Sequence, residues 1–165
     1  MTWRGSVDTM GRIFSVLVYL IAWADAVQFG VFLFQKLPIT SFFFLPALPV
    51  VLIYSFLNPL LFGFGSFLVF LLLFFAVVRN PQVSYFIRFN AMQTILIGIL
   101  LSLIGLVTNT FLQPVLAGGI LLETLYNVAF LGGIGACLYC MFQSAFGRYA
   151  EIPTISQAAY SQLPY

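Results

Sequence analysis

Apolar positions fill long stretches of this chain, and polar positions gather in short connections between them. A membrane-spanning helix needs about 20 consecutive apolar residues, and four stretches approach that length. The pattern therefore predicts an all-α, polytopic membrane protein with one domain over 1–165. The predicted spans are 12–34, 59–78, 88–107 and 123–146, and a polar C-terminal tail follows over 147–165.

The second span is the hardest to place, because apolar residues run from Leu45 to Val78 with prolines among them. At 1.5 Å per residue this stretch is about 50 Å long, too long for one straight span. Proline lacks a backbone donor and clashes with the preceding turn. We therefore start the helix at Pro59 and interpret 42–58 as an interfacial or re-entrant segment. One tilted helix from Val50, kinked at Pro59, is the alternative.

The third span has an amphipathic start, because polar residues alternate with apolar ones from Val83 to Gln93. We expect this helix to begin in the membrane interface near Val83 and to cross by Val107. Polar and helix-breaking residues over 108–119 predict the connection to the fourth span.

Charge is scarce: the 165 residues include six Lys and Arg, four Asp and Glu, and no His. Since roughly a quarter of the residues in an average soluble domain are charged, this count excludes a soluble monomer. Six cations give no basic face for nucleic acid, and the absence of histidine removes His-dependent triads and HExxH metal sites. Four spans place five arginines on the side of both termini and Lys36 on the other. The positive-inside rule then predicts termini in the cytosol or stroma.

Two carboxylates, Asp25 and Glu123, lie in or beside the predicted spans. A central Asp costs roughly 3 kcal/mol to insert, so Asp25 must face protein or water rather than lipid. Two interpretations stay open. Asp25 pairs with an arginine or glutamine and Glu123 complements a helix N-terminus, or both line the path of a conducted substrate. The candidate path or ion-pair residues are Asp25, Gln28, Arg79, Arg88, Asn90, Gln93, Glu123, Asn127 and Gln143.

Cys137 and Cys140 form a CxxC pattern inside the last apolar stretch. Metal sites of this type need further Cys or His ligands, and redox pairs lie at accessible helix starts, so a structural role is favoured and no metal or cofactor is expected. Small residues recur at helical spacing in three spans, which lets membrane helices approach closely. The predicted packing residues are Ala22, Ala26, Gly30, Gly98, Ser102, Gly132, Gly133, Ala136, Cys137, Cys140 and Ser144.

Several strings occur in a specific order along the chain from Arg79 onward. They are Arg79-Asn80, the FIRFNAMQ string at 86–93, Glu123-Thr124-Leu125, Gln143-Ser144, the GRYAEIP string at 147–153, Ile155-Ser156, Tyr160 and Pro164-Tyr165. With them the chain resembles the twenty-kilodalton subunit family of the Tic translocon of the chloroplast inner envelope, including its cyanobacterial homologues. The resemblance covers nearly all residues after Met10. Ala22 and Gln157 depart from it, where relatives often have a proline and an acid, whereas Asp25 and Gly30 fit.

The resemblance implies a subunit that contributes, with other translocon subunits and without enzymatic chemistry, to a preprotein-conducting path. It also implies a location in a cyanobacterial cell membrane or the plastid inner envelope. Four short spans enclose little volume, so such a path needs partners or a homo-oligomer. Two other hypotheses stay open from the residues alone. One is a small ion or metabolite carrier with Asp25 as its coupling carboxylate, and the other is an assembly scaffold for other membrane proteins.

Overall fold

The computed structural model describes residues 7–116 and 119–163, and within these ranges the chain is helical, without strands. This confirms the all-α prediction. The elements are α1 (Thr9–Val27), η1 (Gln28–Gly30), α2 (Val31–Lys36), η2 (Pro38–Ala47), α3 (Leu48–Leu60), α4 (Gly65–Leu72), η3 (Leu73–Val78), α5 (Tyr85–Val107), η4 (Thr108–Leu112), α6 (Gln113–Leu116), α7 (Ile120–Ala145) and α8 (Ile155–Gln162).

Four continuous helical stretches are long and apolar enough to cross a membrane, which confirms the predicted number, but the second of them covers the segment 42–58 that we predicted as interfacial or re-entrant. They are Thr9–Lys36, Pro38–Leu60, Tyr85–Leu116 and Ile120–Ala145, and a shorter apolar helix covers Gly65–Val78. The third stretch is longer than predicted. The expected connection over 108–119 is helical as far as Leu116, since η4 and α6 extend α5.

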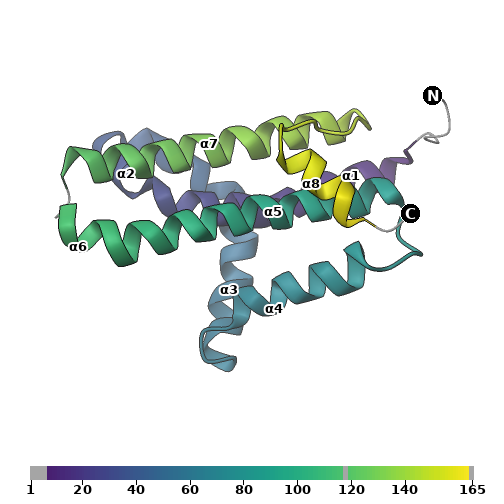
Figure 1. The fold of residues 1–165 in the computed structure, drawn as a ribbon, viewed down its shortest axis with the longest axis horizontal. Coiled ribbons are helices and arrows are strands. Elements are labelled where there is room, and N and C mark those ends of the chain that lie inside the picture. The colour runs from purple at the N-terminus through teal and green to yellow at the C-terminus, as the bar shows by residue number, and fades with distance from the viewer. Residues whose placement is uncertain (1–6, 117–118, 164–165) are drawn as a thin grey trace.

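The three long helices α1, α5 and α7 lie along the long axis of the molecule (Figure 1). α1 packs more extensively than any other element, against α7 on one side and α5 on the other. Its buried face carries small residues, and Ala22 and Ala26 are fully buried. Because small side chains let membrane helices approach closely, α1 forms the centre of the bundle.

The segment 48–78, which we call the arm, departs from this arrangement. Its first helix, α3, runs across the direction of the long helices, and α4 with η3 then runs along that direction (Figure 1). η3 contacts α5, which ties the end of the arm to the bundle. The arm therefore leaves the bundle laterally and returns to it.

The predicted helix start at Pro59 is wrong, and so is the alternative of one kinked helix through it. Pro59 lies in the last turn of α3, and the next helix begins at Gly65. Phe62 and Gly63 have positive φ, a conformation that glycine adopts readily. The Asn58 side chain accepts a hydrogen bond from the Gly65 amide at 2.9 Å. The break is thus made by Gly63 and Gly65 after the proline and by the side chain of Asn58 before it.

The polar C-terminal tail is folded against the bundle over part of its length. Residues Ile155–Gln162 form α8, which packs against α5 and buries Ser156 and Ala159. At the same end of the bundle, Arg12 near the start of α1 lies against Gly147, just after α7. Elements from both ends of the chain therefore meet at one end of the bundle, while Lys36 and Glu123 meet at the other.

Candidate functional site

Polar side chains from three helices meet in a buried network at the end of the bundle that carries α8. The Tyr19 hydroxyl on α1 lies 2.8 Å from Asn90 Oδ1 and 2.7 Å from Gln93 Oε1 on α5. Ser144 on α7 donates to Asn90 Oδ1 at 2.8 Å. Tyr19, Asn90, Gln93 and Ser144 are all fully buried. We call this group the closed network.

The closed network also holds the tail. Gln93 Nε2 donates to the Ala150 carbonyl at 3.1 Å and to Ser156 Oγ at 3.0 Å. Ser156 Oγ in turn accepts from the Ile152 amide at 2.7 Å. The Asn90 amide nitrogen donates to the Phe86 carbonyl at 2.8 Å. Each side-chain amide thus uses both of its ends, and Asn90 and Gln93 connect α5 to α1, α7 and the tail.

Tyr19 is the member of this network that the sequence interpretation missed. A signal was available, because Tyr19 precedes Ala22 and Ala26 at helical spacing and so shares their small-residue face. A tyrosine on a buried face normally finds a hydrogen-bond partner for its hydroxyl.

A second polar region is open, and we call it the groove. It is a hollow of about 900 Å³ between the arm and the helices α1 and α5. Apolar side chains of α1, the arm and α5 form much of its lining. The polar and glycine residues in it are Asp25, Gln28, Tyr54, Asn58, Ser66, Thr94, Gly98, Ser102, Gly105, Asn109 and Thr110. Of the predicted path residues, Asp25 and Gln28 are in this lining.

Asp25 lies near the middle of the stretch Thr9–Lys36, half-buried at the groove. Its carboxylate faces Gly98 on α5, where an added Cβ would lie 3.1 Å from Asp25 Oδ2. Thr94, one helical turn earlier on α5, is 1% exposed. Within the described part of the chain, neither the Asp25 carboxylate nor the Thr94 hydroxyl has a hydrogen-bond or ion-pair partner.

The expected partners of Asp25 are engaged elsewhere. Arg88 is buried and its Nε donates to the Val78 carbonyl at 2.9 Å. The Arg79 guanidinium lies over the Phe74 ring, 5.8 Å from its centre. Gln93 belongs to the closed network, so the pairing interpretation of Asp25 does not describe this structure.

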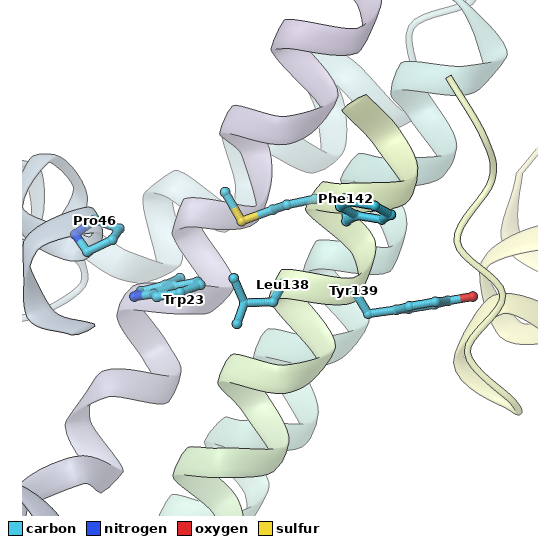
Figure 2. Close-up of a pocket in the computed structure, with 6 residues that line it drawn as sticks. Trp23, Pro46, Leu138, Tyr139 and Phe142 are labelled. Atoms are coloured by element: carbon cyan, nitrogen blue, oxygen red, sulfur yellow. The ribbon is translucent and has the colours of Figure 1, made fainter. Parts of the chain in front are cut away.

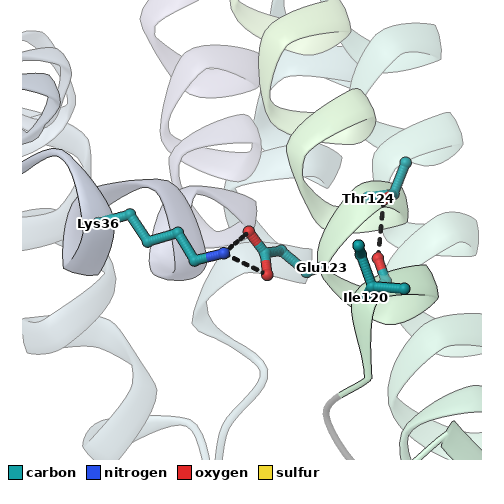
Figure 3. A network of polar contacts seen from close by, with 4 residues as sticks. All are labelled: Lys36, Ile120, Glu123 and Thr124. Carbon is teal, nitrogen blue, oxygen red and sulfur yellow. Dashed lines mark hydrogen bonds and ion pairs between the residues drawn. The ribbon is translucent and has the colours of Figure 1, made fainter.

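Glu123 lies in the first turn of α7, where a carboxylate complements the helix dipole. Lys36 Nζ is 2.6 Å from its Oε1 and 2.8 Å from its Oε2 (Figure 3). The Lys36 side chain is 66% exposed, and surface pairs of this kind contribute about 0–1 kcal/mol. Glu123 therefore joins α2 to α7 outside the groove.

Two further candidates on α7 also lie outside the groove. Asn127 is half-buried, and its Oδ1 is enclosed without a hydrogen-bond partner among the described residues. Gln143 is half-buried near the other end of the same helix. The set predicted as one path therefore divides among the groove, the closed network and separate positions on α7.

Some of the small residues predicted to pack helices are buried between helices, and others are exposed or lie at the groove. Gly133 is buried against α1, where an added Cβ would lie 2.8 Å from Ala26 Cβ. Cys137, Cys140 and Ser144 continue this buried face, and Gly30 is buried in η1. Gly132 is exposed and Ala136 is half-buried. Gly98 lies against Asp25 of α1 at the edge of the groove, and Ser102 lines the groove.

The two cysteines are buried free thiols, and the described residues contain no cluster of metal-binding side chains. Beside them, a hollow of about 580 Å³ separates η2 from α7. Figure 2 shows its lining, which is apolar apart from the hydroxyl of Tyr139 and the indole nitrogen of Trp23. The lining residues are Trp23, Pro46, Leu138, Tyr139, Met141 and Phe142. This hollow offers no charged group and no acid–base chemistry.

These observations define a class, a small multi-pass helical membrane protein with a polar groove inside its apolar body. The family model for the Tic20-like proteins of the chloroplast import apparatus matches residues 8–159. The chain belongs to the Tic20 family, which confirms the resemblance found in the sequence. The names of this family describe a component of protein import rather than an enzyme.

Relatives in cyanobacteria and chloroplasts agree with this assignment. A Tic20 family protein of Synechocystis sp. is 50% identical over the whole of both chains. Two chloroplast proteins of Arabidopsis thaliana, TIC 20-v and TIC 20-II, are each 30% identical. Those two matches cover 96% and 92% of this chain and 73% and 72% of the Arabidopsis proteins.

Proposed function

We propose that this protein is a membrane subunit of a preprotein translocon and that its groove forms one wall of a protein-conducting path. Family membership supports the translocon role. The observation that carries the path role is the Asp25 carboxylate, which lies in an open polar groove without a partner in the described chain. Ionisable groups inside a membrane are costly and normally face a bundle interior, a water-filled cavity or a functional partner.

The groove is a wall rather than a complete channel. It is open on its outer side between the arm and the bundle, and three long helices with one arm do not enclose a polypeptide. Other translocon subunits or a second copy of the chain would supply the remaining wall. The protein would then hold and shield a passing segment without changing it chemically.

The orientation forms part of the proposal. Arg12, Arg79, Arg88 and Arg148 lie at or near the end of the bundle that carries α8, and Lys36 lies at the other. The positive-inside rule places the α8 end in the cytosol or stroma. Cysteines introduced at Gln82 and Ser161 should both react with an impermeant maleimide from that side. Reaction from opposite sides would contradict the orientation.

Photocrosslinking tests the path role. A photoreactive phenylalanine analogue at Phe67 lines the groove, whereas the same analogue at Phe75 is exposed on the same arm outside it. A preprotein stalled in native membranes by a folded C-terminal domain should crosslink several-fold more strongly at Phe67. Equal crosslinking at both positions, or none at either, would contradict the proposal.

Crosslinking and solute uptake in the same membranes distinguish a translocon subunit from a small carrier. A carrier would show no preprotein crosslinks at Phe67, and its Asp25→Asn variant would lose uptake of an ion or metabolite. A translocon subunit would crosslink at Phe67 and leave small-solute uptake unchanged in that variant.

A further inference from the structure

We propose that Asp25 and Thr94, beside Gly98, form a site for the basic side chain of a translocating polypeptide, one Lys or Arg at a time. This inference rests on the proposed function of the groove and names the chemistry that the groove prefers. The groove then acts as a charge-selective surface and not merely as a polar one.

The geometry supplies two acceptors close together. Gly98 has no side chain, so the Asp25 carboxylate approaches the α5 backbone, and a Cβ at 98 would lie 3.1 Å from Oδ2. Thr94 is four residues earlier, and residues at this spacing lie on the same helix face about 5–6 Å apart. The Asp25 carboxylate therefore meets α5 one helical turn from Thr94, whose hydroxyl is buried beside the groove.

The second observation is the state of Thr94. Its side chain is 1% exposed and lines the groove, and its hydroxyl oxygen is buried without a partner among the described residues. Buried hydroxyls are normally hydrogen-bonded. An ammonium group has three donors and a guanidinium five, so one basic side chain can bond to the Asp25 carboxylate and the Thr94 hydroxyl together.

The composition of the lining favours a basic side chain over a metal ion. Asp25 is the one charged residue among the described groove-lining residues, whereas divalent cations usually take several oxygen ligands with more than one carboxylate. A volume of about 900 Å³ is also in the range of pockets that hold whole ligands. A polypeptide side chain with part of its backbone fits this size better than a bare ion.

The negative charge of Asp25 determines that the groove prefers basic over acidic residues of the polypeptide. Lysine and arginine are costly at the centre of a bilayer, and so is an unpaired aspartate. When a basic residue reaches Asp25, each charge reduces the cost of the other. An acidic residue at the same point meets a like charge, so the groove favours basic over acidic segments.

The test uses three stalled preproteins that differ at one position, held opposite the groove and occupied by Lys, Gln or Glu. The readout is the crosslink yield at Phe67 in the full-length protein in native membranes. With Asp25 present, the Lys preprotein should crosslink about fivefold more than the Glu preprotein, a ratio that one partly exposed ion pair can give. Asp25→Asn should bring this ratio close to one, and Thr94→Val should reduce it by about half.

Matched variants keep the result interpretable. Asp25→Glu retains the charge and should retain the preference. Glu123→Gln removes a carboxylate outside the groove and should leave the preference unchanged. Equal crosslink yields for the Lys, Gln and Glu preproteins, with or without Asp25, would overturn this inference and leave the proposed path role unaffected. The absence of crosslinks to any preprotein would overturn the proposed function and this inference with it.

Discussion

The closed network and the groove contain similar polar groups but differ in whether those groups are satisfied. In the closed network, Tyr19, Asn90 and Gln93 bond to one another or to the tail, and all three are fully buried. In the groove, the Asp25 carboxylate and the Thr94 hydroxyl have no partner among the described residues. Satisfied polar groups hold membrane helices together, whereas unsatisfied ones are available to a substrate.

The same helix serves both regions. Tyr19 and Asp25 are both on α1, and both face α5. The difference lies in what packs around them: α7 and the tail bond to the network that contains Tyr19, whereas the arm leaves a hollow beside Asp25. The two regions therefore differ in whether a third element closes the space beside α1 and α5.

The largest effect is expected at Gln93. Gln93→Leu keeps the approximate volume but removes the hydrogen bonds of Gln93 to the Tyr19 hydroxyl, the Ala150 carbonyl and Ser156 Oγ, at about 1 kcal/mol for each bond lost. We expect the free energy of unfolding to fall by about 3 kcal/mol, measured by SDS titration in mixed micelles. Gln28→Leu, at an exposed glutamine in the groove, should change it by less than about 0.5 kcal/mol. Similar losses for both would remove the distinction between the two regions.

Close helix packing on the closed side is tested at Gly133. A methyl group there would lie 2.8 Å from Ala26 Cβ, and overpacking of this kind costs about 1–3 kcal/mol. Gly133→Ala should therefore lower the melting temperature of the detergent-solubilised protein. The control is Gly132→Ala, because an added Cβ at Gly132 meets nothing within 4 Å. A control that melts as early as Gly133→Ala would show that this contact does not limit stability.

A smaller effect is expected from Tyr19→Phe. The phenol has one proton and so donates to one acceptor at a time, although two oxygens lie within 2.8 Å. Loss of one such bond costs about 1 kcal/mol, which the same SDS titration resolves. A loss as large as that of Gln93→Leu would mean that Tyr19 organises the whole network.

The smallest effect on stability is expected at Asp25. Because no described group pairs with its carboxylate, Asp25→Asn should leave the free energy of unfolding within about 0.5 kcal/mol and should ease insertion. Abundance in the membrane should match the wild type while preprotein passage falls, each measured at native expression level. A lower abundance would instead indicate an ion pair that involves Asp25.

The sequence predicted the helices better than their connections. Long apolar runs determine which segments are helical, so the helical class and four long apolar stretches follow from pattern alone. The helix predicted to start at Pro59 starts only at Gly65, because Pro59 lies in the last turn of α3. The Asn58 side chain and Gly63 then end that helix. The crosswise direction of α3 depends on tertiary contacts that no periodicity encodes.

The candidate site was predicted only in part, for a similar reason. Asp25 and Gln28 could be chosen because polar residues inside an apolar run are costly, and that cost is visible in sequence. Asn90 and Gln93 carry the same signal, yet they belong to the closed network, because a linear pattern does not show which polar groups find each other. Gly98 was predicted as a packing residue and does lie against α1, but the sequence does not show that the group it meets there is the Asp25 carboxylate.

The short second half of the arm has a consequence for the lipid around the protein. The helix over Gly65–Val78 is about 20 Å long at 1.5 Å per residue, whereas a typical hydrocarbon core is about 30 Å thick. A lipid-facing helix this short is matched by thinning of the bilayer beside it, by flanking side chains that extend to the interface, or by association with other helices. Thinning beside the groove would shorten the apolar distance that a polar segment crosses in the proposed path.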